Sequence, residues 1–181
     1  MKNSNENRNP RILDTSALVH DPKSLLAYRD DIYICLTVLE ELDNLKERLD
    51  KSVSQDARLV IRMLEEIING HSSEEMEKGI DLPSTETAKR GKLFIGIDTQ
   101  IDFAKELKHA IGSDADNRII NYALHMQNEL KQDVTIVSRD INMRLKARTI
   151  GVDAEDVLVD NQISDIDLLY TGVQSFTGDF F

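Results

Sequence analysis

Short apolar runs alternate with longer stretches of helical spacing along most of the chain. The runs predict strands over residues 11–15, 32–36, 92–97, 134–137 and, less regularly, 157–159. Helices are predicted between them, over 16–28 with an interruption at Asp21-Pro22, over 37–45, from a Ser52 or Ser54 cap to Gly70, from a Ser113 cap to 130, and over 140–150. This alternation predicts an α/β fold, a single three-layer domain with a mostly parallel central sheet of about five strands.

Three polar segments interrupt this pattern. Residues 1–10 are predicted to be a disordered N-terminal segment, and residues 173–181 a C-terminal tail. Residues 71–91 are polar and contain Pro83, which predicts a mobile surface insertion within a domain that spans 11–172.

Composition narrows the class of protein. The chain has 181 residues, enough for one domain with a substantial core, and it has no apolar run near the ~20 residues of a membrane span. The N-terminal residues are too polar for a signal peptide, and the single cysteine, Cys35, rules out a disulfide within the chain. We therefore expect a cytoplasmic protein with no membrane partner. The net charge of −11 argues against general electrostatic binding of nucleic acid, so contact with a phosphate chain must be local.

Four acidic residues are predicted to meet at one edge of the sheet. Asp14 and Asp140 each follow a predicted strand and precede a helix. Glu41 lies one turn into the helix after the second strand, and Asp116 lies in the first turn of the helix that Ser113 would cap. Because the carboxyl ends of parallel strands share an edge, where α/β proteins place their ligands, all four belong to the same rim.

Each acid also has a purely structural interpretation. Asp14 and Asp140 are good N-caps, Ser113 and Asp116 match a capping box, and Glu41 fits a solvated helix face. Taken together, however, four carboxylates on one rim repel each other, and a bound divalent cation would offset that repulsion. Ligands that offer only oxygen favour Mg²⁺ or Mn²⁺. Such an ion can position a water molecule to attack a phosphodiester.

A phosphatase with Asp14 as the nucleophile is a third interpretation. Enzymes that form an aspartyl phosphate usually carry a second acid two residues after the nucleophile, and that position here is Ser16. The sequence therefore disfavours this mechanism.

Four segments together carry a resemblance to a known family. They are Ile12-Leu13-Asp14-Thr15-Ser16-Ala17-Leu18, Val38-Leu39-Glu40-Glu41-Leu42-Asp43, Asp116-Asn117-Arg118-Ile119-Ile120 and Val137-Ser138-Arg139-Asp140-Ile141-Asn142. In this order and spacing the chain resembles a PIN domain, the metal-dependent ribonuclease fold, and most closely the PIN domain at the N-terminus of PhoH-like proteins. The likeness runs from about Arg11 to Gly172.

The resemblance implies an Mg²⁺- or Mn²⁺-dependent endoribonuclease that hydrolyses phosphodiester bonds of single-stranded RNA. The family's acidic positions fall on Asp14, Glu41, Asp116 and Asp140. It implies that the three aspartates bind the metal or its water, and that Glu41 orients the water or a second ion. Ser16 departs from the asparagine that is usual near the first turn.

Further residues near these acids are candidates for supporting the site or touching RNA. They are Thr15, Ser16, Asp114, Arg118, Ser138, Arg139, Asn142 and Arg144. The basic residues among them, with Lys146 and Arg148, form a possible phosphate track. Their structural interpretation is compensation of helix dipoles and solvation.

Partners follow from the same resemblance. PhoH-like relatives continue into an ATPase domain, and this chain has no Gly-x-x-x-x-Gly-Lys-Ser/Thr loop. A PhoH-like ATPase domain, attached or separate, is therefore an expected partner beside single-stranded RNA, and the sequence is compatible with a homo-oligomer. The alternative function is a catalytically weak PIN module that binds RNA or protein and regulates an attached PhoH-like ATPase.

Overall fold

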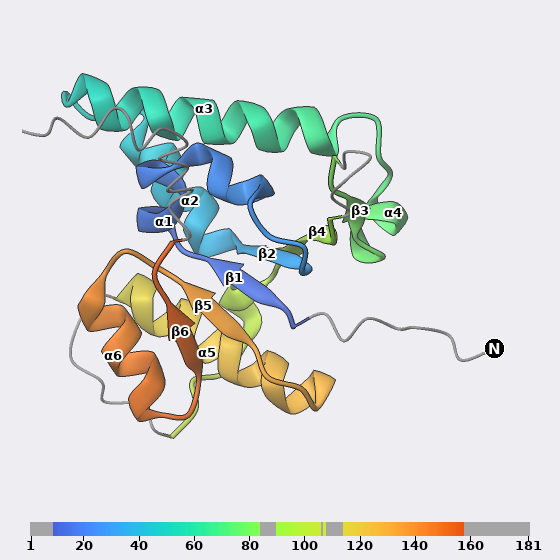
Figure 1. Ribbon diagram of the computed structural model, residues 1–181, viewed down its shortest axis with the longest axis vertical. Coiled ribbons are helices and arrows are strands. Elements are labelled where there is room, and N and C mark those ends of the chain that lie inside the picture. The colour runs from blue at the N-terminus through green and yellow to red at the C-terminus, as the bar shows by residue number, and fades with distance from the viewer. Residues whose placement is uncertain (1–8, 84–89, 106, 108–113, 158–181) are drawn as a thin grey trace, which may run out of the picture.

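A six-stranded sheet runs through the middle of the protein (Figure 1). The computed structural model describes residues 9–83, 90–105, 107 and 114–157. The strands are β1 (Arg11–Leu13), β2 (Ile32–Cys35), β3 (Ile80–Asp81), β4 (Lys92–Gly96), β5 (Thr135–Val137) and β6 (Asp153–Glu155). Their order across the sheet is β3-β4-β2-β1-β5-β6.

The sheet is parallel except at one edge. In β1, Arg11 pairs with Ile32 of β2 on one side and with Thr135 of β5 on the other. The strand β3 runs antiparallel to β4 and adds a sixth strand to the five expected from the sequence. The predicted mostly parallel α/β fold is confirmed, and the extra strand was missed because two residues are too few to show a period.

Helices cover both faces of this sheet. They are α1 (Thr15–His20), η1 (Pro22–Leu26), α2 (Leu36–Leu45), α3 (Lys51–Ile68), α4 (Ser73–Glu77), η2 (Asp98–Gln100), α5 (Asp114–Leu130) and α6 (Ile141–Thr149). The chain moves from β1 towards β2 and β4, and then crosses back to β5 and β6. Because such crossovers are right-handed, this reversal places α1 to α3 on one side of the sheet and α5 and α6 on the other, as Figure 1 shows.

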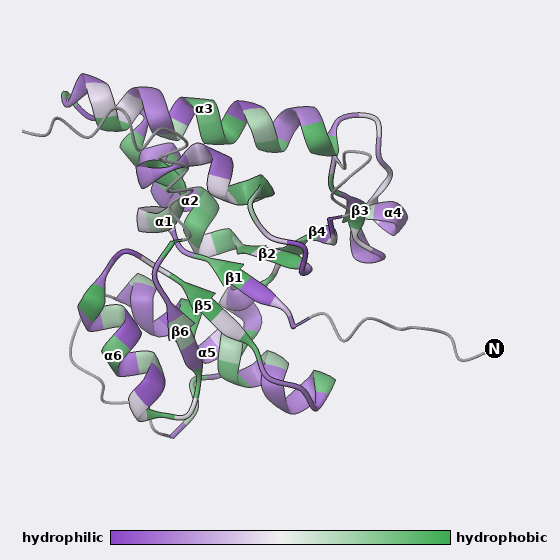
Figure 2. Cartoon of the chain, in the orientation of Figure 1, coloured by the Kyte–Doolittle hydropathy of each residue, from purple (hydrophilic) through white to green (hydrophobic). Residues whose placement is uncertain are grey.

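The central strands are apolar because both of their faces are covered (Figure 2). Ile12 and Leu13 of β1 and Ile136 and Val137 of β5 have no exposed surface. These buried strands end directly before the polar segments 14–16 and 138–140, so the core fixes the start of both.

Two helix starts differ from the prediction. The first strand ends at Leu13, because Asp14 is the N-cap of α1 and its carboxylate accepts a hydrogen bond from the N–H of Ser16. The cap of α3 is Asp50, and neither Ser52 nor Ser54 has this role. The Asp50 carboxylate accepts from two N–H groups of the first turn, whereas the hydroxyl of Ser54 donates back to the carbonyl of Lys51.

The predicted strand 157–159 is also misplaced. The edge strand is β6 at 153–155, where polar residues on one face hide the alternation, and residues 158 and 159 lie outside the described part. The predicted Ser113 cap also lies outside it, as do residues 1–8 and the tail.

The predicted insertion at 71–91 contains regular structure. Both α4 and β3 lie within its described residues, and its mobility stays a prediction. No helix of the described residues has the length and apolar character that a membrane crossing requires.

Candidate active site

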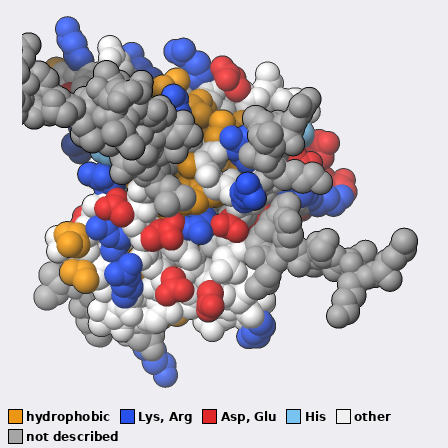
Figure 3. Space-filling view, in the orientation of Figure 1, with side chains coloured by type: hydrophobic (Ala, Val, Ile, Leu, Met, Phe, Trp, Pro, Cys, Tyr) orange, Lys and Arg blue, Asp and Glu red, His pale blue; other side chains and the backbone are white. Residues whose placement is uncertain are grey.

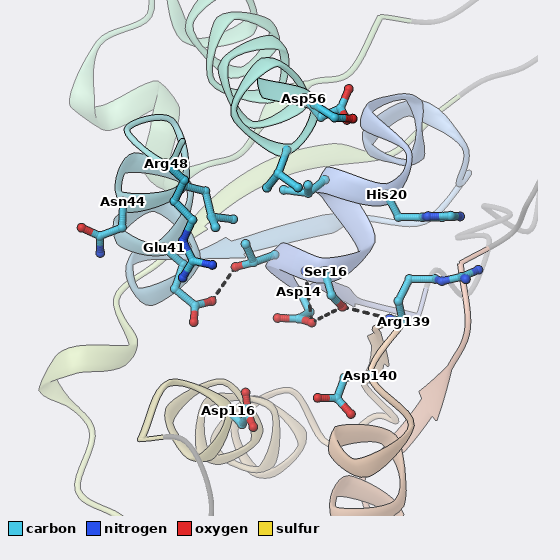
Figure 4. Close-up of a pocket in the computed structure, with 15 residues that line it drawn as sticks. Asp14, Ser16, His20, Glu41, Asn44, Arg48, Asp56, Asp116, Arg139 and Asp140 are labelled. Carbon is cyan, nitrogen blue, oxygen red and sulfur yellow. Dashed lines mark hydrogen bonds between the residues drawn. The ribbon is translucent and has the colours of Figure 1, made fainter. Parts of the chain in front are cut away.

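The four predicted acids line one pocket of about 850 Å³ at the carboxyl edge of the sheet (Figure 4). Asp14 lies between β1 and α1, Glu41 on α2, Asp116 on α5 and Asp140 at the start of α6. The chain turns to β2 on one side of β1 and to β5 on the other, so this is the point where the strand order reverses. Open α/β sheets bind their ligands at such a point.

The carboxylate of Asp14 accepts three hydrogen bonds, and one of its two oxygens accepts all of them. Oδ2 accepts from the hydroxyl of Ser16 at 2.6 Å, from the hydroxyl of Ser138 at 2.8 Å and from the N–H of Ser16 at 3.3 Å. The Asp14 N–H donates to the carbonyl of Val137 at 3.0 Å, which ties its backbone to β5. Within the described residues nothing donates to Oδ1, so this buried side chain has a fixed orientation and one oxygen left for a ligand.

Two serine hydroxyls join the turns that carry Asp14 and Asp140. The Oγ atoms of Ser16 and Ser138 lie 3.1 Å apart. Ser138 Oγ accepts from the N–H of Asp140 at 3.0 Å, and Ser16 Oγ accepts from the N–H of Arg139 at 3.0 Å. The hydroxyl network thereby fixes the distance between the two turns.

Glu41 is oriented from the neighbouring helix. The hydroxyl of Thr15 donates to Glu41 Oε2 at 2.6 Å, across the junction of α1 and α2 (Figure 4). Burial raises the pKa of Glu41, and the Thr15 hydrogen bond opposes that rise. The negative charges of Asp14 and Asp116 raise the pKa of Glu41 further, so the electrostatic effect of both acids reaches it across the pocket.

Asp116 lies under the same influences. Burial raises its pKa, the charge of Asp14 adds to the rise, Lys146 opposes it, and Asp140 adds a smaller contribution. The Nζ of Lys146 is itself held at 2.9 Å from Oδ1 of Asn117. The negative charges of Asp14 and Asp140 therefore both act on Asp116 in the folded protein.

Asp140 serves as an N-cap and lines the pocket as well. Its Oδ1 accepts from the N–H of Asn142 at 2.7 Å and from the N–H of Met143 at 3.4 Å. The structural interpretation of this residue is thus correct, and it does not exclude a second role for the exposed side chain. Asn142 contributes its backbone N–H to this cap.

Of the predicted cations, Arg139 lines the pocket. Its guanidinium lies 3.8 Å from the carboxylate of Asp156. Arg144 is turned to the same acid at 3.2 Å and donates to the carbonyl of Ser138 at 2.6 Å, so it braces the turn before α6. Arg148 donates to the carbonyl of Ala154 at 3.0 Å and braces β6.

Two other predicted residues lie outside the pocket lining. Arg118 sits over the ring of Phe103, with 5.8 Å between its guanidinium carbon and the ring centroid. Asp114 is the exposed first residue of α5.

A second wall of the pocket was not predicted from the sequence. It is formed by Val19, His20, Asn44, Leu45, Arg48, Ser52, Val53 and Asp56. Asn44, Leu45 and Arg48 come three, four and seven positions after Glu41, which is the spacing of one helix face. Reading the helix onward from Glu41 would have found them.

The donor chemistry of the pocket fits a hard divalent cation. Among the described residues, no three side chains of His, Cys, Asp or Glu stand close enough to hold an ion as they are. Mg²⁺, however, keeps several of its waters and needs only one or two carboxylates directly. The four predicted acids offer oxygen ligands only, and Asp14 has one oxygen that accepts no hydrogen bond from the described residues, so their chemistry meets those needs.

The comparisons with known proteins point to one family. A family model described as "PIN domain" matches residues 11–158. The chain is 29% identical over 178 residues to Protein PhoH2 of Bacillus subtilis, covering 89% of this chain and 35% of that protein. It is 29% identical over 147 residues to Protein PhoH2 of Thermobispora bispora, covering 80% and 31%. The chain therefore spans about a third of the length of these curated relatives.

A solved structure is also similar. It is the T. brucei RRP44 PIN domain, with a TM-score of 0.41 and 12% identity, covering 83% of this chain and 76% of that one.

Proposed function

Because this chain belongs to the PIN domain family, we propose that it is an Mg²⁺- or Mn²⁺-dependent endoribonuclease that hydrolyses phosphodiester bonds of single-stranded RNA. The observation that carries the proposal is the arrangement around Asp14. The four predicted acids line one pocket, and the most buried of them, Asp14, accepts hydrogen bonds on Oδ2 and none from the described residues on Oδ1.

Asp14, Asp116 and Asp140 would hold the cation in this proposal. When bound, the ion supplies positive charge that lowers the pKa of a water molecule and stabilises the leaving oxygen. Asp14 keeps its oxygen aimed into the pocket because Ser16 and Ser138 occupy the other one. Asp140 stays in place because its Oδ1 caps α6.

Glu41 would orient the attacking water and accept its proton. Its pKa lies above the ordinary value of a glutamate, because of burial first, and this makes it a better base than an exposed carboxylate. Thr15 holds the carboxylate towards the pocket. Both groups are side chains of this protein, so substitution of Glu41 or Thr15 tests their roles.

The charge distribution supports local contact with RNA over broad electrostatic binding. Figure 3 shows Asp and Glu side chains interspersed with Lys and Arg on the face in view. With a net charge of −11, affinity must come from the pocket and its immediate cations, such as Arg139.

A regulatory module is the second candidate function. The chain matches only about a third of the PhoH2 proteins, which favours a role beside a further, PhoH-like ATPase domain. In that case the pocket binds RNA or protein without cutting it, and the effect is on the attached ATPase.

The test is Asp14→Asn assayed on a fluorescent single-stranded oligoribonucleotide, in Mn²⁺, in Mg²⁺ and in EDTA. We expect the wild type to cut only with the metal, and the variant to fall to the level of a mock purification while its circular dichroism is unchanged. Asp133→Asn is the matched control, because Asp133 is exposed and lies outside the pocket.

Each outcome separates the two candidates. Equal metal-dependent cleavage by wild type and Asp14→Asn, above the level of the mock purification, would overturn the role given to Asp14. Binding of the oligonucleotide without cleavage by the wild type would favour the regulatory module.

A further inference from the structure

The pocket is larger than a site for a cation and a phosphate requires. Its volume of about 850 Å³ lies within the range of pockets that enclose small organic ligands. Asp14, Glu41, Asp116 and Asp140 occupy one end, and the rest of the space, which Asp56 lines, extends between α1, α2 and the start of α3.

Three aliphatic side chains line that second part. Val19 comes from α1, Leu45 from the end of α2 and Val53 from the first turn of α3, and each is half-buried. Val19 and Leu45 pack against the core, so their exposed sides form a fixed apolar surface. A flat, uncharged group fits such a surface better than a phosphate does.

Arg48 stands beside this surface. It follows α2 by one turn, and Figure 4 shows its side chain reaching into the pocket on the same side as Glu41. Although five acids line the same pocket, Asp56 of the second wall among them, Arg48 forms no ion pair with any acid in the described ranges. Arg139, by comparison, is turned towards Asp156. A guanidinium that served only to neutralise the pocket would contact an acid.

We propose that Val19, Leu45, Val53 and Arg48 form a subsite for one nucleotide of the RNA strand beside the cleaved bond. The base lies against the three aliphatic side chains, and the guanidinium of Arg48 binds a phosphate of that nucleotide. Proteins that bind single strands combine these two contacts, a surface for the base face and a cation for the backbone. This inference rests on the proposed ribonuclease function and adds the residues that position the strand.

The side chains also predict how selective the subsite is. No Phe, Tyr or Trp is among the residues that line the pocket in the described part of the chain, and the one ring in the lining is the imidazole of His20. Aliphatic contact accepts the face of any base, and we therefore expect weak discrimination among the four nucleotides.

The experiment is a binding titration of the full chain, followed by methyl NMR of its Val and Leu residues in Mg²⁺. The probes are AMP, ribose 5-phosphate and inorganic phosphate. We expect AMP to shift the methyl signals of Val19, Leu45 and Val53, and the two probes without a base to leave them in place. Arg48→Ala should weaken AMP binding about ten-fold.

Two variants control for charge and structure. Lys51 lies three residues after Arg48, and its side chain is outside the pocket lining. Lys51→Ala therefore removes a nearby positive charge without changing the subsite, and it should keep AMP affinity within about two-fold. Arg48→Lys keeps the charge without the guanidinium fork, and its affinity should fall between those of the wild type and Arg48→Ala.

The outcomes distinguish this inference from the function on which it rests. If all three probes shift the same signals, or if Arg48→Ala and Lys51→Ala behave alike, the subsite is wrong even where Asp14-dependent cleavage is observed. If none of the three probes shifts these methyl signals, the surface does not bind a nucleotide and the inference is overturned. If AMP binds as described and the wild type does not cut RNA, the subsite stands and the ribonuclease proposal fails.

Discussion

The hydroxyl of Thr15 and the carboxylate of Glu41 are 2.6 Å apart and link the first turn of α1 to the middle of α2. The two residues belong to helices that follow neighbouring strands, so the bond holds α2 in place relative to α1 on the pocket side of both helices. It also stabilises the charged form of Glu41, against the burial and the neighbouring charges that raise its pKa.

Thr15→Val should therefore change the pH dependence of cleavage. The substitution keeps the shape of a buried side chain and removes the donor to Glu41. Without that hydrogen bond the pKa of Glu41 rises further, so the acidic limb of the profile of kcat/KM should move to higher pH. Loss of one hydrogen bond to a charged group should also lower kcat/KM by about ten-fold at pH 7.

Thr149→Val is the control for that profile, because Thr149 is exposed and its hydroxyl bonds only to the carbonyl of Leu145 in its own helix. An unshifted acidic limb in Thr15→Val would mean that Glu41 does not act as a base.

Asp116→Asn should stabilise the metal-free protein at neutral pH. The folded state holds the proton of Asp116 more tightly than the unfolded chain does, because burial and like charges raise its pKa above 3.8. The free energy of unfolding of the wild type should therefore fall as pH rises through that raised pKa, and the variant should escape this loss. Relief of about 1 kcal/mol would raise Tm by roughly 2–4 °C in a domain of this size.

Melting curves in EDTA at pH 7 and at pH 3.5 measure this effect. The gain in Tm should be present at pH 7 and disappear at pH 3.5, while Asp133→Asn shows no such pattern. Excess Mg²⁺ should raise Tm more for the wild type than for Asp116→Asn, because an ion bound only by the folded state stabilises it by mass action. Equal shifts in Mg²⁺ would remove Asp116 from the cation site.

Asp140 allows its structural and chemical roles to be separated by two substitutions. Asp140→Ala loses the acceptor for the first N–H groups of α6 and should lower the free energy of unfolding by about 1 kcal/mol. Asp140→Asn keeps a capping oxygen and should stay close to the wild type in stability. We expect both to lose RNA cleavage. Full activity in a stable Asp140→Asn would leave Asp140 as a cap alone.

Asp98, which is far from α2 in the sequence, should hold the first turn of this helix in place. It is 2% exposed, and its carboxylate accepts from the hydroxyl of Thr37 and, at 3.3 Å, from the N–H of the same residue. The N-cap residue of α2, Cys35, makes no side-chain cap bond, so Asp98 replaces it. Asp98→Ala leaves the buried hydroxyl unpaired and should cost roughly 2–4 kcal/mol of unfolding free energy.

Urea unfolding measures that loss, and Asp98→Asn should lose less because it keeps an acceptor. Since Glu41 is carried on α2, cleavage should fall with Asp98→Ala even at temperatures where the variant is folded. A fully stable Asp98→Ala would show that α2 needs no cap from outside.

The strand ends could be predicted from the sequence because each buried strand stops abruptly at a polar residue. The apolar runs before Asp14 and before Ser138 are short and uninterrupted, and the fold brings both ends to one pocket. The edge strand β6 was misplaced because two polar residues interrupt its apolar pattern, the exposed Asp153 and Glu155, which pairs with Arg11.

The remaining features depend on contacts between distant parts of the chain. Asp98 accepts from the N–H of Thr37 in the first turn of α2, 61 positions before it, and no local pattern indicates such a bond. Arg48 was missed for a different reason. It lies in the turn after α2, where the helical spacing from Glu41 continues although the helix itself has ended at Leu45.

The hydrogen bond between Ser138 and Asp14 joins residues that are 124 positions apart, and this separation sets when the pocket forms during synthesis. Translation releases the N-terminal part first, so α1 and α2 leave the ribosome long before β5 and α6. Until β5 pairs with β1, Asp14 lacks one of its two hydroxyl donors, and the wall that carries Asp140 is absent. A growing chain is therefore without its complete pocket until β5 and α6 have left the ribosome.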